Sequence, residues 1–148
     1  QNNHRFEAVL KDGERICGEW LAQAHGTKYN LWHEPFVAFD IISGKVRLCY
    51  EQMFDRLRLS FITPNIVGYG PISVDDALLL MGGGHHGAID KVEGVIYRVE
   101  RKGAVDFLTK YVRHDKEDGK YLPEQNGTGQ PIWNVDIKQF TSEELKIK

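Results

Sequence analysis

A glutamate and a lysine on neighbouring strands give residues 91–113 the most distinctive chemistry of the chain. Two alternating runs, GVIYRVE and VDFLTKYVR, are separated by RKGA, and this pattern predicts a β-hairpin. Glu93 lies at the mouth of the first strand, before a glycine that lets a ligand or another backbone approach closely. Lys110 lies in a second strand that we expect to be mostly buried, where an unpaired charge is costly. The simplest alternative is a cross-strand ion pair on a solvated face.

Two further strands carry residues that could act with this pair. The run from Arg15 to Leu21 contains Glu19, which could equally lie on the solvent face of an edge strand, and the strand FVAFDII contains Phe39 and Asp40. An aromatic residue in such a strand is more often part of the core than a stacking surface. If these side chains converge, they suit a nucleotide: the ring stacks on a base, the lysine neutralises phosphate, and carboxylates hold ribose hydroxyls or a divalent metal.

The sequence patterns of the strands and helices that must position these residues predict an α+β fold, with mainly antiparallel sheets and a few short helices. Residues 6–21 predict a first hairpin with a turn at KDGE, and residues 61–71 predict a strand with loop ends. In the strand at residues 36–42, alternation places one set on one face (Phe36, Ala38, Asp40) and a second set on the other (Val37, Phe39, Ile41).

Two helices are expected beside these strands. The first has apolar residues at i, i+3, i+4 and i+7 (Tyr50, Met53, Phe54, Leu57). The second begins at Ser73, three residues before Asp76 in a pattern like a capping box. The polar tail from residue 114 onward contains one strand candidate, around Trp133.

Composition excludes several classes of protein. The 148 residues, 41% hydrophobic and 27% charged, indicate one globular domain over residues 1–148, and a formal charge of -2 gives no global basic signature. No apolar run is long enough to span a membrane and no signal sequence is visible, so we expect a cytoplasmic protein in which Cys17 and Cys49 are reduced. The GGGHH segment has neither a phosphate-loop spacing nor the ligands of a zinc site.

Four segments in order resemble motifs III, IIIa, IV and V of the covalent nucleotidyltransferases, the superfamily of ATP-dependent ligases and capping enzymes. These segments are RICGEWL, FVAFDII, EGVIYR and FLTKYVR, and they are most similar to the RNA ligase branch. The resemblance covers about residues 15–121. It implies an ATP-grasp-like nucleotidyltransferase domain, of which this chain forms the C-terminal two-thirds.

The resemblance also implies a reaction and a role for each matching residue. A lysine forms a lysyl-AMP with ATP, the AMP passes to an RNA 5′-phosphate, and a 3′-hydroxyl displaces it to seal the RNA ends. Glu19 would contact the ribose or metal side, Phe39 would stack on adenine, and Lys110 would contact the α-phosphate. Glu93 would bind Mg²⁺ or Mn²⁺, with Glu19 as a second candidate ligand.

The nucleophilic lysine of motif I, Lys-x-Asp-Gly, is expected to be missing from this chain. Lys11 stands directly before Asp12, which is the wrong spacing, and Lys91 overlaps motif IV. The chain also begins with Gln1 instead of methionine. We therefore expect the nucleophile to come from a separate N-terminal segment or another chain. The alternatives are a non-catalytic nucleotide-binding or RNA-binding domain of the same fold, a related DNA ligase or capping-type enzyme, and an α+β protein whose charged hairpin is purely structural.

Overall fold

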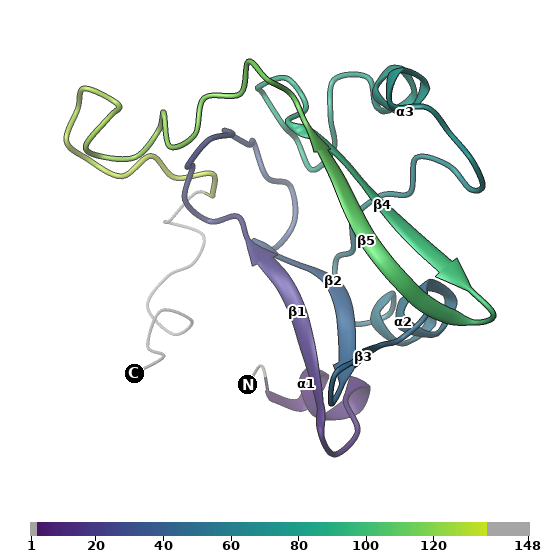
Figure 1. Cartoon of the computed structure of the whole chain (residues 1–148). Helices are drawn as coiled ribbons and strands as arrows, with labels where there is room; N and C mark the ends of the chain where they lie inside the picture. The colour runs from purple at the N-terminus through teal and green to yellow at the C-terminus, as the bar shows by residue number, and fades with distance from the viewer. Residues whose placement is uncertain (1–2, 136–148) are drawn as a thin grey trace.

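Two antiparallel sheets and three short helices make up the part of the chain that the structure, a computed structural model, describes, residues 3–135 (Figure 1). The first sheet has the order β1 (Glu14–Trp20), β2 (Phe36–Ser43) and β3 (Val46–Arg47), and the second is the hairpin of β4 (Gly94–Arg101) and β5 (Ala104–Val112). The helices are α1 (Asn3–Val9), α2 (Tyr50–Leu57) and α3 (Val74–Met81). The structure thus confirms the predicted α+β class.

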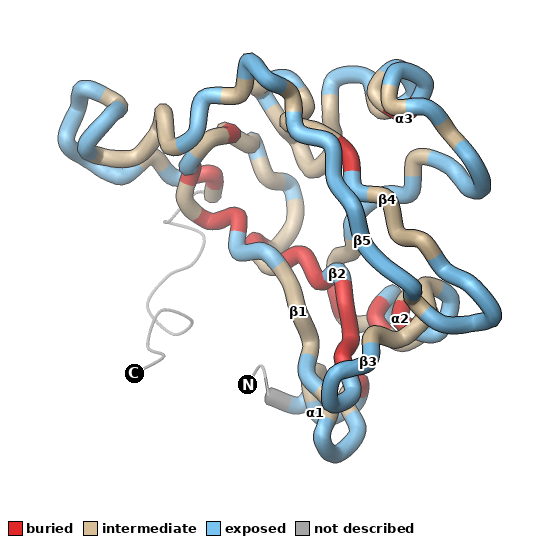
Figure 2. The backbone as a smooth tube through the Cα atoms, viewed as in Figure 1, coloured by how far each residue is buried: buried red, intermediate tan, exposed pale blue. Residues whose placement is uncertain are grey.

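The hydrophobic core lies between β2, α1 and α2. Ala38 and Ile41 of β2 are fully buried and pack with residues from both helices and from the segment after α2 (Val9, Met53, Leu57, Phe61). Figure 2 shows the buried positions along β2, in α2 and in the loop after β1. Burying one such side chain stabilises the fold by about 1.5–3 kcal/mol. The cluster therefore holds β2 firmly in place in the first sheet.

A β-bulge in β2 changes the predicted alternation of this strand. Cys17 pairs with Asp40 and Gly18 pairs with Ala38, so Phe39 is an extra residue with no partner in β1. Ala38 and Ile41 consequently share the core face although they are three residues apart. The prediction that Ala38 lies on the face of Asp40 and opposite Ile41 is therefore wrong, because the extra residue shifts the phase of the strand.

The predicted first hairpin is only half correct. Its second strand is present as β1, but residues 3–9 form helix α1 instead of a strand. Phe6, Val9 and Leu10 follow helical spacing and pack against the core. The short apolar run fits both periodicities, and packing against β2 and α2 decides in favour of the helix.

Both predicted helices after the first sheet are confirmed. In α3 the Ser73 side chain caps the helix, and its Oγ accepts a hydrogen bond from the Asp76 amide at 3.1 Å. The strand expected at residues 61–71 is wrong, because only Ile62 makes a bridge, to Val37. Pro64 and Pro71 lack the amide hydrogen that a paired strand would donate there.

The hairpin of β4 and β5 forms as predicted, but its second strand is not buried. Its turn places Lys102 and Gly103 at φ 53° and 74°, as a tight two-residue turn requires. Every residue of β5 except Val105 is exposed, so the expectation that Lys110 lies in a mostly buried strand is wrong. The apolar pattern indicates a strand, whereas burial needs a second layer, and the helices in the described residues leave β5 uncovered.

Cys17 and Cys49 are free. Across residues 3–135 no helix has the length and apolar character needed to cross a membrane. Trp133 makes a single bridge to Gln23 instead of a strand, and the last part of the tail, residues 136–148, lies outside the described residues.

Replacing Arg56 by methionine should lower the stability of the domain by about 2 kcal/mol at neutral pH. The Arg56 guanidinium hydrogen-bonds both carboxylate oxygens of Glu14, at 3.0 Å from Nη1 to Oε1, and the Val9 carbonyl. The hydrogen bonds from Arg56 to the carboxylate, and next the bond from the Lys11 amide, lower the pKa of Glu14 from 4.5 to about 2. The stabilisation is therefore complete above pH 4.5 and is lost as the pH falls towards 2.

Urea unfolding at pH 7 and near pH 2 measures this prediction. The difference between wild type and Arg56→Met should be large at pH 7 and should shrink at the acid end. Arg58→Met is the matched control, since its bond to Asp55 is exposed. Equal losses for the two variants at pH 7, or a loss that does not change with pH, would contradict the prediction.

Candidate functional site

An open pocket of about 1890 Å³ lies between the first sheet and the β4–β5 hairpin. Glu19 and Phe39 line it from β1 and β2, and Glu93 lines it from the residue before β4. The structure therefore brings three of the four sequence-predicted residues to one cavity. The bulge in β2 contributes to this, since Phe39 and its neighbour Asp40 both line the pocket.

Glu93 is held at both of its carboxylate oxygens. The Thr27 hydroxyl donates to Oε1 at 2.5 Å, and the Lys116 ammonium lies 2.9 Å from Oε2. A Cβ at Gly94 would lie 1.9 Å from the Tyr111 carbonyl oxygen, so glycine here admits the backbone of β5. The close approach expected at Gly94 is therefore made by the backbone of β5. This contact holds the start of β4 in place, and Glu93 is the residue directly before it.

Tyr29 lies near the two predicted carboxylates. Burial, and next the negative charges of Glu19 and Glu93, together raise the pKa of its hydroxyl to about 12. The phenol is consequently a neutral hydrogen-bond donor at physiological pH. Two carboxylates and a donor hydroxyl at one end of the pocket form a polar end that can hold ribose hydroxyls.

Lys116 joins this polar end from the segment that follows β5. Its ammonium contacts Asp118 at 2.7 Å as well as Glu93. The bond to Asp118, and next the bond to Glu93, raise the pKa of Lys116 above its ordinary value. Lys116 is therefore a fixed positive charge and, because it stays protonated, a poor nucleophile.

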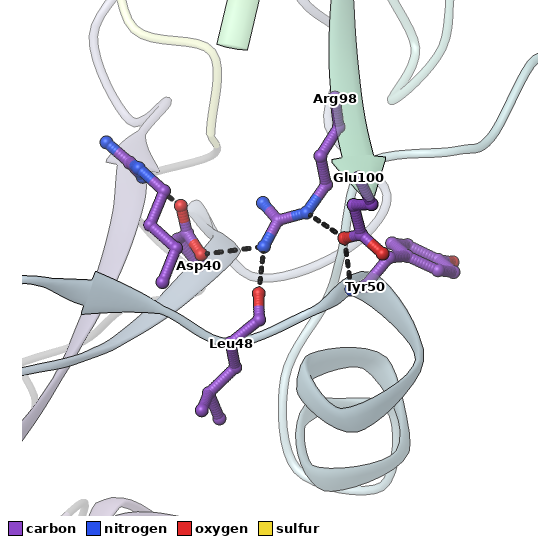
Figure 3. A network of polar contacts seen from close by, with 6 residues as sticks. Asp40, Leu48, Tyr50, Arg98 and Glu100 are labelled. Carbon is purple, nitrogen blue, oxygen red and sulfur yellow. Dashed lines mark hydrogen bonds and ion pairs between the residues drawn. The ribbon is translucent and has the colours of Figure 1, made fainter. Parts of the chain in front are cut away.

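A partly buried ionic network around Asp40, the residue after Phe39, joins the two sheets (Figure 3). Asp40 is fully buried, and its carboxylate forms ion pairs with Arg47 and, at 3.3 Å, with Arg98 of β4. Arg98 also donates to the Leu48 carbonyl and pairs with Glu100 at 2.8 Å. The same Glu100 oxygen, Oε1, accepts the Tyr50 amide at the start of α2. The network thus ties β2, β4 and α2 together at one wall of the pocket.

Lys110 does not line the pocket, although β4, the strand it pairs with, lines it from Gly94 to Glu100. It pairs directly with Ile96, and Leu108 pairs with Arg98. Directly paired residues point to the same face, so Lys110 shares its face with three pocket-lining residues, Ile96, Arg98 and Leu108. Lys110 is exposed, and in the described residues it forms no ion pair with Glu93, which rules out the simple cross-strand pair.

The described residues do not form a ready metal site at Glu93. No group of three or more histidine, cysteine, aspartate or glutamate side chains comes together within residues 3–135. Both oxygens of Glu93 are already engaged, one by Thr27 and one by a cation, Lys116. A divalent ion bound there would have to displace the ammonium. The Mg²⁺ or Mn²⁺ ion that the resemblance implies stays a prediction.

Sequence reasoning missed Thr27, Tyr29, Arg98 and Lys116 as site residues. Thr27 and Tyr29 lie in the loop after β1, which reads only as polar, and Lys116 lies beyond the last motif. Arg98 is the last residue of the segment EGVIYR. A charged residue inside this apolar strand was the one sequence signal that could have indicated a partner such as the buried Asp40. The other three meet Glu93 or its neighbours through contacts 23 to 66 residues apart in sequence, which no local pattern encodes.

Comparison with known proteins supports one family assignment. A family model described as RNA ligase matches residues 1–112 of the 148. Neither a curated protein nor a solved structure matches the chain significantly. The matched region contains Glu19, Phe39, Glu93 and Lys110 and ends at the last residue of β5. The chain therefore belongs to the RNA ligase family.

Proposed function

We propose that this chain is the nucleotide-binding part of an ATP-dependent RNA ligase, in the nucleotidyltransferase superfamily and with an ATP-grasp-like domain. The observation that carries the proposal is the single pocket that brings Glu19, Phe39 and Glu93 together from three separate segments. In our proposal residues 1–148 form one domain, which acts in the cytoplasm on ATP and RNA ends.

The polar and aromatic ends of the pocket suit different parts of an adenine nucleotide. Phe39 is 40% exposed and can stack on the base without leaving its strand. Glu19 and Tyr29 lie where ribose hydroxyls can be held, next to Glu93. Lys110 lies on β5, whose partner strand β4 lines the pocket, and would contact a phosphate that extends along the hairpin. The pocket exceeds the usual 300–1,000 Å³ of a small-ligand site, so an RNA end can enter with the nucleotide.

The covalent chemistry needs a lysine supplied by a separate N-terminal segment or another chain. Its neutral amine attacks the α-phosphorus of ATP, the bond to pyrophosphate breaks, and lysyl-AMP forms. The 5′-phosphate of RNA then takes the AMP and frees the lysine. Finally a 3′-hydroxyl attacks that phosphate, the strand is sealed, and AMP leaves. In these steps the chain's own residues bind and orient the nucleotide.

A second candidate function is a nucleotide-binding or RNA-binding domain that does not react. One observation favours it: the lysine nearest Glu93 in the described residues, Lys116, is held protonated by two carboxylates. A lysine in that state does not attack phosphorus. Both functions share the pocket and differ only in whether a covalent adduct forms.

Incubation with α-labelled ATP and a divalent metal, followed by denaturation, separates the two functions. With a peptide or chain that supplies Lys-x-Asp-Gly, the ligase proposal expects labelled AMP on the supplied lysine, and GTP should not replace ATP as it would for a capping enzyme. Equilibrium binding of ATP to this chain is the more basic requirement. Failure to bind ATP with a dissociation constant below the millimolar range would contradict the ligase and the non-reacting nucleotide-binding domain, and would leave only the RNA-binding domain.

A further inference from the structure

The segment that follows the family-matched region reaches back into the candidate site. The RNA ligase match ends at residue 112, and the next residues, 113–122, return to the loop after β1. In Figure 1 this segment leaves the end of β5 and runs beside that loop. Its Lys116 provides the cation at Glu93, a residue to which the family resemblance assigns a metal ion.

The position of Lys116 is built by contacts on both sides of it. The Arg113 amide donates to the Glu93 carbonyl at 2.8 Å, so the segment begins at the candidate ligand itself. The Tyr121 amide donates to the His25 carbonyl at 2.9 Å, and the Lys120 ammonium lies 2.7 Å from Asp90. Because the chain is fastened before and after Lys116, its ammonium is held at Glu93 instead of moving freely in solvent.

The charges around Lys116 favour retention of a cation at this place. Glu93 and Asp118 both contact the ammonium, and Glu19 adds a further negative charge near Tyr29. Two carboxylates, Glu93 and Asp118, therefore share the single positive charge of Lys116. The Lys116 side chain is 23% exposed, whereas those of Glu93 and Asp118 are 38% and 86% exposed, so the pair with Glu93 is the less screened of the two.

A divalent cation and the Lys116 ammonium cannot both bind the same oxygen of Glu93. Oε1 is taken by the Thr27 hydroxyl and Oε2 by Lys116, and no group of three metal-ligating side chains is present within residues 3–135. A metal would have to displace a charge that is already in place and would be repelled by it at short range. Neutralising Lys116 removes that competitor and frees one carboxylate oxygen.

We propose that Lys116 is the resident counter-ion of Glu93 and excludes a divalent cation from that carboxylate in this chain. The inference deepens the proposed function, on which it rests for the assignment of Glu93 to the nucleotide pocket. It makes Lys116 a positioning residue: it holds Glu93 towards the ribose end of the pocket and does so without metal.

The test is a titration of the full 148-residue chain with Mn²⁺. The electron paramagnetic resonance signal of free Mn²⁺ measures how much of the ion remains unbound at each step. In the wild-type background, Glu93→Gln should leave Mn²⁺ affinity unchanged. Lys116→Gln should raise Mn²⁺ affinity by about tenfold or more, since it removes a unit charge within contact distance. Lys116→Arg, which keeps the charge, should behave as wild type, and Lys116→Gln with Glu93→Gln should lose the gain.

Three results would overturn the inference. The first is a tenfold weaker Mn²⁺ affinity of Glu93→Gln alone, which would show that Glu93 already binds metal beside Lys116. The second is an unchanged affinity of Lys116→Gln, and the third is a gain that persists in the double variant. The first comparison does not depend on whether the Lys116 variants fold. Mn²⁺ binding is measured without nucleotide, so its outcome is separate from the ATP-binding test of the proposed function.

Discussion

Asp40→Ala is expected to lower the free energy of unfolding by about 3–5 kcal/mol, because it removes a fully buried carboxylate that pairs with both Arg47 and Arg98. Asp40 has no solvent-exposed surface, and the side chain of Arg98 is only 16% exposed. The guanidinium of Arg98 would keep Glu100 but lose the carboxylate on its other side. Urea unfolding at pH 7, with wild type measured in parallel, gives the difference.

Asp55→Ala is the matched control for this prediction. Asp55 also forms an ion pair, with Arg58 at 3.3 Å, but its side chain is 66% exposed. Exposed pairs contribute about 0–1 kcal/mol, so this variant should stay close to wild type. If Asp40→Ala costs no more than Asp55→Ala, the network of Figure 3 does not hold the two sheets together. A large loss also predicts weaker nucleotide binding, since the network forms a wall of the pocket.

Local patterns predicted those elements whose spacing fits a single periodicity. The β4–β5 hairpin, α2 and the Ser73 cap of α3 each follow from residues within one turn or one strand of each other. The errors arose where packing decides. The apolar residues of 3–9 fit both a strand and a helix pattern, and this segment forms a helix. The apolar strand β5 is exposed because no helix or sheet among the described residues covers it. Neither outcome is encoded in the spacing of the residues concerned.

The candidate site was predictable as a set of residue types and not as a geometry. Glu19, Phe39 and Glu93 could be named from their segments, and the structure brings them to one pocket. The bulge that turns Phe39 and Asp40 to the same side depends on the pairing of β1 with β2, which only the folded sheet specifies. Thr27 and Lys116 reach Glu93 from 66 residues before it and 23 residues after it.

Phe39→Ala is expected to weaken ATP binding by about 5-fold to 150-fold while changing stability little. Stacking of a base on an aromatic ring contributes about 1–3 kcal/mol, which corresponds to this range of affinity. The ring is 40% exposed and lies outside the core cluster, so its loss should cost the fold about 1 kcal/mol. Isothermal titration with ATP measures the affinity, and urea unfolding measures the stability.

Phe107→Ala and Phe39→Trp turn this expectation into a test of stacking. Phe107 is 46% exposed on β5 and does not line the pocket, so its loss should leave ATP affinity unchanged. Tryptophan at position 39 keeps an aromatic face and should retain most of the affinity. If Phe39→Ala and Phe107→Ala weaken ATP binding equally, both side chains affect ATP affinity through general packing and not through stacking on the base. A loss confined to Phe39→Ala would instead require a planar ligand against this ring, because the two phenylalanines differ mainly in what they face.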